Sequence, residues 1–307
     1  MRRLSAALVL VSVFVLTRPF DAGAQARVER NLVYGMYSGL ALLLDVHHPD
    51  TPKGLGVIYV PGSAWQAPLA YGASSLKDSN YTPEWLAALL RGGYTVFIVN
   101  HRATPRFHYP EPVEDVQRAV RFVRHNAGRF GVDPSRLGGV GESSGAHLIA
   151  LVAMLGAPAI PNDRDPVNAQ PATLQAVVTR SAPADLSKMV GANTIATAVV
   201  VTLVNRLPTP MPEDQAAYRA ASPVTHVSAS SPPILLTHGD ADDTVPFQQA
   251  VDMEAALRKV NVPVRLVRVA GGTHNGDFGT GGKPHAQFQN VLTDVVGWLN
   301  QYLSGNR

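Results

Sequence analysis

The chain has 307 residues, of which 46% are apolar and 16% are charged. This composition is typical of a globular protein with a sizeable core, and it excludes a collagen, a coiled coil and a disordered chain. The absence of Cys excludes disulfides, thiolate zinc sites and a Cys nucleophile. Lys and Arg form no cluster that alternates with aromatic residues, so we expect no nucleic-acid partner.

Residues 1–26 have the pattern of a secretory signal peptide. Two arginines precede an uncharged run, Leu4–Leu16, and small residues follow, with cleavage expected after Ala24 or Ala26. The run has 13 residues, fewer than the ~20 of a spanning helix, and no later stretch is long enough. We therefore expect a secreted or periplasmic protein without an integral membrane span. An uncleaved N-terminal anchor is the alternative. Removing residues 1–26 lowers the formal net charge from +3 to +1.

Beyond residue 26, short β-branched runs alternate with longer amphipathic stretches, which predicts strands joined by crossover helices in a mostly parallel sheet. The expected strands are 28–34, 40–47, 57–60, 95–99, 137–140, 176–179, 234–237 and 264–269, the first two as an antiparallel edge pair. The expected helices are 82–91, 111–130, 144–155, 247–260 and 287–303. We expect one α/β domain over residues 27–307, because no linker-like stretch divides the chain.

Residues 185–222 fit this alternation poorly. They contain the apolar run Ile195–Leu207 and then three prolines between positions 208 and 212. Connections of this length are typical of cap or lid insertions, and an ordinary crossover helix with a proline-rich exit is an equally weighted alternative.

Residues 137–147 contain the motif with the most specific chemistry. An apolar strand leads into G-x-S-x-G, Gly141 to Gly145, and a helix-forming run follows. This is the context of a nucleophile elbow, in which the glycines allow a tight turn that exposes the hydroxyl of Ser143. A turn without chemistry is the alternative.

A serine hydroxyl needs a base to accept its proton and a carboxylate to orient that base. The strand 234–237 leads into a loop with Asp240, Asp242 and Asp243, and the strand 264–269 leads into a loop with His274. The order serine, acid, histidine is the one expected after a nucleophile elbow. His147 and His238 are expected to pack or hydrogen-bond locally. No spacing typical of a metal site is present, so we expect neither a metal nor a cofactor.

With these motifs the chain resembles the α/β-hydrolase superfamily, specifically secreted esterases and lipases of the hormone-sensitive-lipase-like and feruloyl-esterase-related (BD-FAE) type. The resemblance covers nearly the whole of residues 27–307, and it also rests on Asn100–Arg102, residues 110–115 and the H-G-D-x-D…V-P loop. It implies an α/β-hydrolase fold with an eight-stranded sheet and helices on both faces. It also implies a triad of Ser143, Asp242 and His274, with Asp240 and Asp243 as the competing acids.

By the same resemblance, the backbone N–H groups of Ser63, Ala64 and Ser144 form the oxyanion hole. The loop reads P-G-S-A-W over residues 61–65, where hormone-sensitive-lipase-like enzymes read H-G-G-G. Two residues with a Cβ replace glycines, which predicts less room for a bulky alcohol. A plain strand-ending turn is the alternative. Trp65 is a candidate substrate contact, although aromatic residues near a sheet are more often core. Glu142 is expected to be solvated or structurally paired and outside the triad.

We therefore expect a serine hydrolase that cleaves carboxylic esters, with short acyl groups on small or polymer-linked alcohols, through an acyl-enzyme. A prolyl-oligopeptidase-like serine peptidase is one alternative, because Ser222-Pro223 and the H-G-D-x-D…V-P loop also occur in that group. A non-catalytic binding protein with the same fold is the other.

Overall fold

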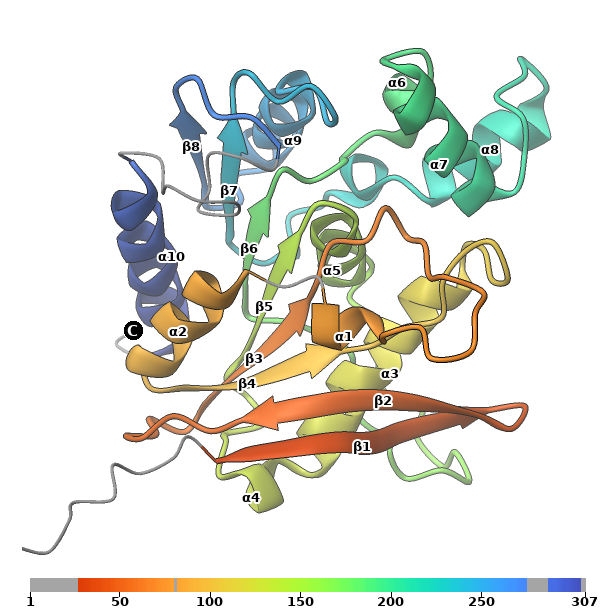
Figure 1. The fold of residues 1–307 in the computed structure, drawn as a ribbon. Coiled ribbons are helices and arrows are strands. Elements are labelled where there is room, and N and C mark those ends of the chain that lie inside the picture. Colours follow the sequence, from red (N-terminus) through yellow and green to blue (C-terminus); the bar gives the residue numbers. More distant parts are fainter. Residues whose placement is uncertain (1–26, 80–81, 275–286, 305–307) are drawn as a thin grey trace, which may run out of the picture.

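The structure is a computed structural model that describes residues 27–79, 82–274 and 287–304 (Figure 1). Its sheet has eight strands in the order β1-β2-β4-β3-β5-β6-β7-β8. The strands are β1 (Val28–Tyr37), β2 (Leu40–His47), β3 (Leu55–Val60), β4 (Tyr94–Val99), β5 (Leu137–Glu142), β6 (Ala176–Arg180), β7 (Ile234–Gly239) and β8 (Val264–Val269). β1 pairs antiparallel with β2, β2 pairs antiparallel with β4, and the remaining neighbours are parallel. The predicted sheet and its antiparallel edge are confirmed.

The helices predicted over 82–91, 144–155, 247–260 and 287–303 lie close to the expected positions. The helices of the described residues are α1 (Leu76–Ser79), α2 (Pro83–Arg91), α3 (Glu111–His125), α4 (Ala127–Phe130), α5 (Ser144–Leu155), α6 (Leu186–Met189), α7 (Thr194–Val204), α8 (Pro212–Ala220), the 3₁₀ helix η1 (Pro223–His226), α9 (Gln248–Lys259) and α10 (Phe288–Leu303). The prediction of one helix over 111–130 is wrong. Asn126 leaves the helical backbone with φ −100° and ψ 19°, and its side-chain amide donates to the Phe122 carbonyl, so α3 ends and α4 begins.

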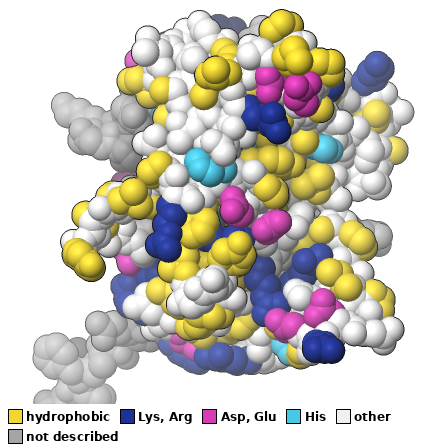
Figure 2. All heavy atoms as spheres, turned by 90° about the vertical axis from the view of Figure 1, so that its right-hand side faces the viewer, with side chains coloured by type: hydrophobic (Ala, Val, Ile, Leu, Met, Phe, Trp, Pro, Cys, Tyr) yellow, Lys and Arg dark blue, Asp and Glu magenta, His cyan; other side chains and the backbone are white. Residues whose placement is uncertain are grey.

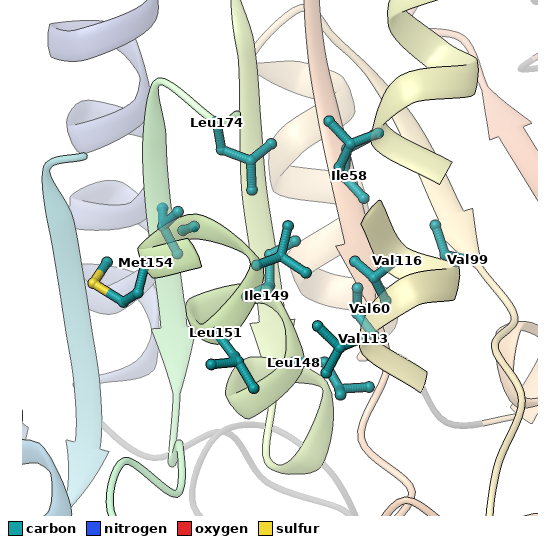
Figure 3. Close-up of a cluster of buried hydrophobic side chains, with 14 of the residues drawn as sticks. Ile58, Val60, Val99, Val113, Val116, Leu148, Ile149, Leu151, Met154 and Leu174 are labelled. Atoms are coloured by element: carbon teal, nitrogen blue, oxygen red, sulfur yellow. The ribbon is translucent and has the colours of Figure 1, made fainter. Parts of the chain in front are cut away.

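Helices cover both faces of the sheet. Successive side chains of a strand point to opposite faces, so one strand contributes to both cores. On one face, Val57 and Tyr59 of β3 pack in a cluster with Trp85 of α2 and residues of α10. On the other face, Ile58 and Val60 of the same strand belong to the cluster shown in Figure 3, with side chains of α3 and α5. Burial on both faces explains why the central strands are continuous apolar runs in the sequence.

Residues 185–222, called the insertion below, form α6, α7 and α8 at the upper right of Figure 1. Ala196, Val200 and Leu203 of α7 are buried in the same cluster as α3 and α5. Ile195, 70% exposed, and Leu207, 68% exposed, lie in the same segment. Figure 2 shows that side of the molecule, with hydrophobic side chains visible on its upper part, where the insertion lies. The insertion thus packs on the body through one apolar side and leaves other apolar side chains exposed. Whether it acts as a lid stays a prediction.

The parallel strands place four chain segments at one edge of the sheet. β5, β6, β7 and β8 are neighbours in that order, and they end at Glu142, Arg180, Gly239 and Val269. The residues that follow these ends therefore come close together, although up to about 130 residues separate them along the chain. Ligand sites of open α/β sheets lie at this carboxyl edge.

Candidate active site

The turn between β5 and α5 holds Ser143 in a strained conformation. Its φ is 51° and its ψ is −121°, in the positive-φ region that non-glycine residues seldom adopt. A Cβ at Gly141 would lie 2.5 Å from the Gly145 carbonyl oxygen, and a Cβ at Gly145 would lie 2.1 Å from the Val60 oxygen. Only glycine fits at either position, so the two glycines let β3, β5 and α5 approach closely and present the serine at the turn.

The structure brings Ser143, His274 and Asp242 together. His274 Nε2 lies 2.9 Å from Ser143 Oγ, and His274 Nδ1 lies 2.8 Å from Asp242 Oδ2. Asp242 follows β7, and His274 follows β8. The Asp242 side chain is fully buried and that of His274 is 8% exposed. The arrangement can move a proton from the hydroxyl to the imidazole while the carboxylate faces the other ring nitrogen.

The environment of Asp242 keeps it ionised. Burial raises its pKa, but hydrogen bonds from His238 and His274 outweigh this effect and hold the pKa well below its ordinary value. The backbone N–H groups of Thr244 and Val245 also donate to this carboxylate, at 3.0 and 2.8 Å. Asp242 is therefore ionised at neutral pH beside the His274 ring.

The competing acids of the same loop have other partners. Asp240 forms an ion pair with Arg268 at 2.6 Å and accepts from the Gly271 N–H at 2.6 Å. Asp243 accepts from the Thr244 hydroxyl at 3.2 Å. His238 is buried, as expected of a locally bonded histidine, and its Nε2 lies 3.3 Å from Asp242 Oδ2 and 2.9 Å from the Val245 carbonyl oxygen.

The loop after β3 lies against the elbow. A Cβ at Gly62 would lie 2.9 Å from the Glu142 carbonyl oxygen, so a glycine is required there too. Ala64 and Trp65 have positive φ values of 53° and 57°. The Ser63 N–H donates to Ser144 Oγ at 2.8 Å. This contact was not foreseen, and it means that one of the three expected oxyanion donors already has an acceptor, the hydroxyl next to the nucleophile.

Trp65 lies in the core beside this loop, with 2% of the residue exposed. Its indole Nε1 donates to His147 Nδ1 at 3.1 Å, and the two rings meet edge to face with centroids 5.1 Å apart. His147 Nε2 in turn donates to the Ala221 carbonyl at 2.7 Å, at the end of the insertion. This placement favours a core role for Trp65 over the substrate contact that the sequence predicted.

A buried ion pair lies behind the elbow. Glu142 Oε2 is 2.5 Å from Arg180 Nη1, and both residues are 5% exposed. Thr82 and Tyr59 also donate to the Glu142 carboxylate. Glu142 is thus structurally paired and outside the Ser143 contacts, as expected, but it is not solvated. Arg180 is the last residue of β6, one residue beyond the strand end predicted at Thr179, and the sequence pattern did not indicate it as a site residue.

The described part of the chain contains neither a candidate metal site nor a candidate membrane-spanning helix. Over residues 27–79, 82–274 and 287–304, His, Asp and Glu side chains form no group of three or more that could hold a metal ion. Within the same ranges, none of the helices is both long and apolar enough to cross a bilayer.

Two curated proteins similar to this chain are described as ester hydrolases. LipM of Mycobacterium tuberculosis, described as a probable carboxylic ester hydrolase, is 30% identical over 76% of this chain and 52% of its own length. The chain spans about half the length of this and another curated relative, the esterase LipQ of the same organism.

Solved structures share the fold. A truncated carbohydrate esterase from gut microbiota has a TM-score of 0.72 at 24% identity and covers 91% of this chain and 97% of its own. Propionate-bound esterase 2 of Thermogutta terrifontis has a TM-score of 0.68 at 23% identity, covering 92% and 97%. Residues 44–257, well over half of the sequence, match the BD-FAE family. The predicted resemblance is confirmed: the chain has the α/β-hydrolase fold and belongs to the BD-FAE family.

Proposed function

We propose that this protein is a serine carboxylic-ester hydrolase in which Ser143, His274 and Asp242 form the triad. The observation that carries the proposal is the pair of contacts of the His274 ring, 2.9 Å to the Ser143 hydroxyl and 2.8 Å to the Asp242 carboxylate. Membership of the BD-FAE family and a relative described as a probable carboxylic ester hydrolase support the choice of an ester as substrate.

In the first half of the reaction, Ser143 Oγ attacks the ester carbonyl while His274 Nε2 accepts the hydroxyl proton. The ionised Asp242 stabilises the imidazolium that forms. The carbonyl oxygen becomes an oxyanion, which accepts hydrogen bonds from the Ala64 and Ser144 N–H groups. The Ser63 N–H joins them when the Ser144 hydroxyl turns away. Collapse of the tetrahedral intermediate breaks the bond to the alcohol, and His274 returns the proton to that leaving oxygen.

In the second half, a water molecule attacks the acyl-enzyme. His274 takes a proton from this water, and the same N–H groups hold the second oxyanion. Ser143 then leaves as the free hydroxyl, with the proton returned by His274, and the carboxylic acid is released. The cycle balances with ester and water consumed and acid and alcohol formed, and the residues named supply each step.

The proposed substrates are esters of short acyl groups, on small alcohols or on alcohols that belong to a polymer. Ser63 and Ala64 carry a Cβ in the loop that faces the ester, which limits the space beside the oxyanion. The esterase from Thermogutta terrifontis that shares this fold binds propionate, and the gut enzyme is described as a carbohydrate esterase. The first description supports a short acyl group, and the second supports a carbohydrate as the alcohol.

The test is a series of p-nitrophenyl esters, from acetate to long acyl chains, with wild type and Ser143→Ala. We expect wild type to prefer the shortest esters. We expect Ser143→Ala to lower kcat/KM by at least about 10⁴-fold with an unchanged Tm, because the hydroxyl contacts the triad and not the core. Substantial turnover by Ser143→Ala contradicts the assignment of the nucleophile.

Two further reagents, an aminoacyl-anilide and a fluorophosphonate, separate the alternatives. Hydrolysis of an aminoacyl-anilide without hydrolysis of simple esters favours a peptidase. No labelling of Ser143 by a fluorophosphonate favours a binding protein without catalysis. We further propose that the protein is exported, with residues 1–26 as the signal peptide, on the strength of the charge pattern and small residues of that segment.

A further inference from the structure

We infer that Arg180 is a positioning residue that holds the nucleophile and the base relative to each other. Arg180 is the last residue of β6, beside the end of β5. Its carbonyl oxygen accepts from the Ser143 N–H at 2.8 Å, and its Nη2 donates to the His274 carbonyl oxygen at 3.0 Å. One residue thus contacts the backbone of both groups. The inference rests on the proposed function, because it concerns the same triad.

The guanidinium is itself held in place. Nη1 lies 2.5 Å from Glu142 Oε2 and 3.0 Å from Thr82 Oγ1. Glu142 and Arg180 are partners in the register of β5 and β6, so the sheet brings the two side chains together. The Tyr59 hydroxyl also donates to Glu142, and burial together with this carboxylate raises the pKa of Tyr59 well above its ordinary value. The phenol therefore stays a donor, and the carboxylate that orients Arg180 is fully hydrogen-bonded.

Position matters here because His274 must meet two partners at once. Its ring spans Asp242 and Ser143 with contacts of 2.8 and 2.9 Å, so a shift of its backbone lengthens at least one of them. A misplacement of about 1 Å can cost about 10²-fold in rate. Arg180 restrains this backbone at the carbonyl of His274 itself. Since Glu142 neutralises the guanidinium, the restraint adds little positive charge beside the imidazolium that forms during turnover.

The first variant is Arg180→Lys. An ammonium is a point donor without the planar fork of guanidinium, so it cannot replace the contacts to Glu142 and His274 together. We expect kcat to fall by about 10²-fold with KM within about twofold, because the geometry of the triad changes and ground-state binding does not.

Arg124→Lys is the matched control. Arg124 is also a buried arginine that donates to backbone carbonyls, at 2.9 Å to Pro134 and 2.8 Å to Thr173. These residues precede β5 and β6, at the amino ends of the strands, whereas Ser143 and Arg180 lie at the carboxyl ends. We expect Arg124→Lys to lower Tm about as much as Arg180→Lys while kcat stays at the wild-type value.

A second variant separates folding from positioning. Removing one partner of a buried ion pair is strongly destabilising, whereas removing both is often tolerated. We therefore expect the double variant Glu142→Gln/Arg180→Met to fold even where Arg180→Lys does not, and to keep the low kcat. A double variant with wild-type kcat overturns the inference.

A spectroscopic readout makes the test independent of turnover. The proton between His274 Nδ1 and Asp242 gives a low-field ¹H NMR resonance in a rigid pair. We expect this resonance in wild type and in Arg124→Lys, and its loss or broadening in Arg180→Lys. An unchanged low-field resonance in Arg180→Lys overturns the inference. A loss of kcat in Arg124→Lys equal to that in Arg180→Lys also overturns it. If wild type itself hydrolyses no ester, the proposed function fails, and the resonance still decides the role of Arg180.

Discussion

At the residue scale, His147 connects three parts of the molecule that are far apart in the chain. It lies one helical turn after Ser143, accepts from the indole of Trp65 and donates to the carbonyl of Ala221. Burial lowers its pKa to about 4, and the hydrogen bond to Ala221 opposes this only in part. The ring is therefore neutral at pH 7, with the proton on Nε2 and the acceptor at Nδ1.

This low pKa predicts a pH-dependent stability. In the unfolded chain the ring titrates near pH 6.5, so between pH 6.5 and 4 the unfolded state binds more protons than the folded state. The contribution of His147 is fully present above pH 6.5 and is lost as the pH falls toward 4. Gln offers one acceptor and one donor without titrating. We expect His147→Gln to lose about 2 kcal/mol less than wild type between pH 7.5 and 4.5, measured by urea unfolding. Parallel losses in the two proteins contradict the prediction.

At the element scale, the crossing of β3, β5 and α5 is the contact that shapes the site. Gly145, in the first turn of α5, faces the end of β3, and its missing side chain lets the helix lie directly against the strand backbone. A Cβ there would lie 2.1 Å from the Val60 oxygen and 2.4 Å from the Pro61 oxygen. Backbone atoms cannot move aside as a flexible side chain can, so the helix would have to shift away from the strand.

We therefore expect Gly145→Ala to lower the free energy of unfolding by about 3 kcal/mol, the upper part of the range for overpacking. The control is Gly297→Ala in α10, where, apart from the helix's own backbone and the two adjacent residues, no atom of the described residues lies within 4 Å of the added Cβ. In a helix this exchange should stabilise by about 0.5–1 kcal/mol. Urea unfolding of both variants measures whether the free energy of unfolding falls in Gly145→Ala and rises in Gly297→Ala. An unchanged free energy of unfolding in Gly145→Ala contradicts the prediction, because it shows that a Cβ fits between α5 and β3.

At the scale of the whole molecule, the sheet topology brings the proposed triad together, and the insertion contacts the loop of Asp242, where Asn193 Nδ2 donates to the Asp243 carbonyl at 3.1 Å. Ser143, Asp242 and His274 follow β5, β7 and β8, which are all parallel and end at one edge. The insertion is attached at its base, where Gln249 of α9 accepts from the N–H groups of Ala184 and Asp185. The body thus carries the proposed chemistry, and the segment over residues 185–222 is placed by contacts at its ends and along α7.

The N-terminus of the chain, residues 1–26, lies outside the described residues. The exported protein should begin at Gln25 or Arg27, as measured by intact mass. In the control Ala24→Arg/Ala26→Arg, large charged residues replace the small ones that cleavage requires, and the precursor should accumulate. Recovery of the full-length wild-type chain from a membrane fraction supports the anchor alternative.

The amino-acid sequence by itself determined the succession of most strands and helices along the chain and placed Ser143, an acidic loop and His274 after the ends of strands. These features are local, because hydrophobic periodicity and the glycines of a turn act over a few neighbouring residues. The choice of Asp242 over Asp240 and Asp243 came from the family resemblance. The end of α3 at His125 was missed, since apolar residues continue at helical spacing through Phe130 while one side chain, Asn126, interrupts the backbone.

Only the tertiary structure decided which distant side chains meet. The pairing of Glu142 with Arg180 depends on the register of β5 and β6, and the contact of Arg180 with His274 joins residues 94 positions apart. The contact of Ser63 with Ser144 and that of Trp65 with His147 likewise cross more than 80 residues. No short stretch of sequence contains both partners, so their hydrogen bonds exist only after the sheet and its helices have packed.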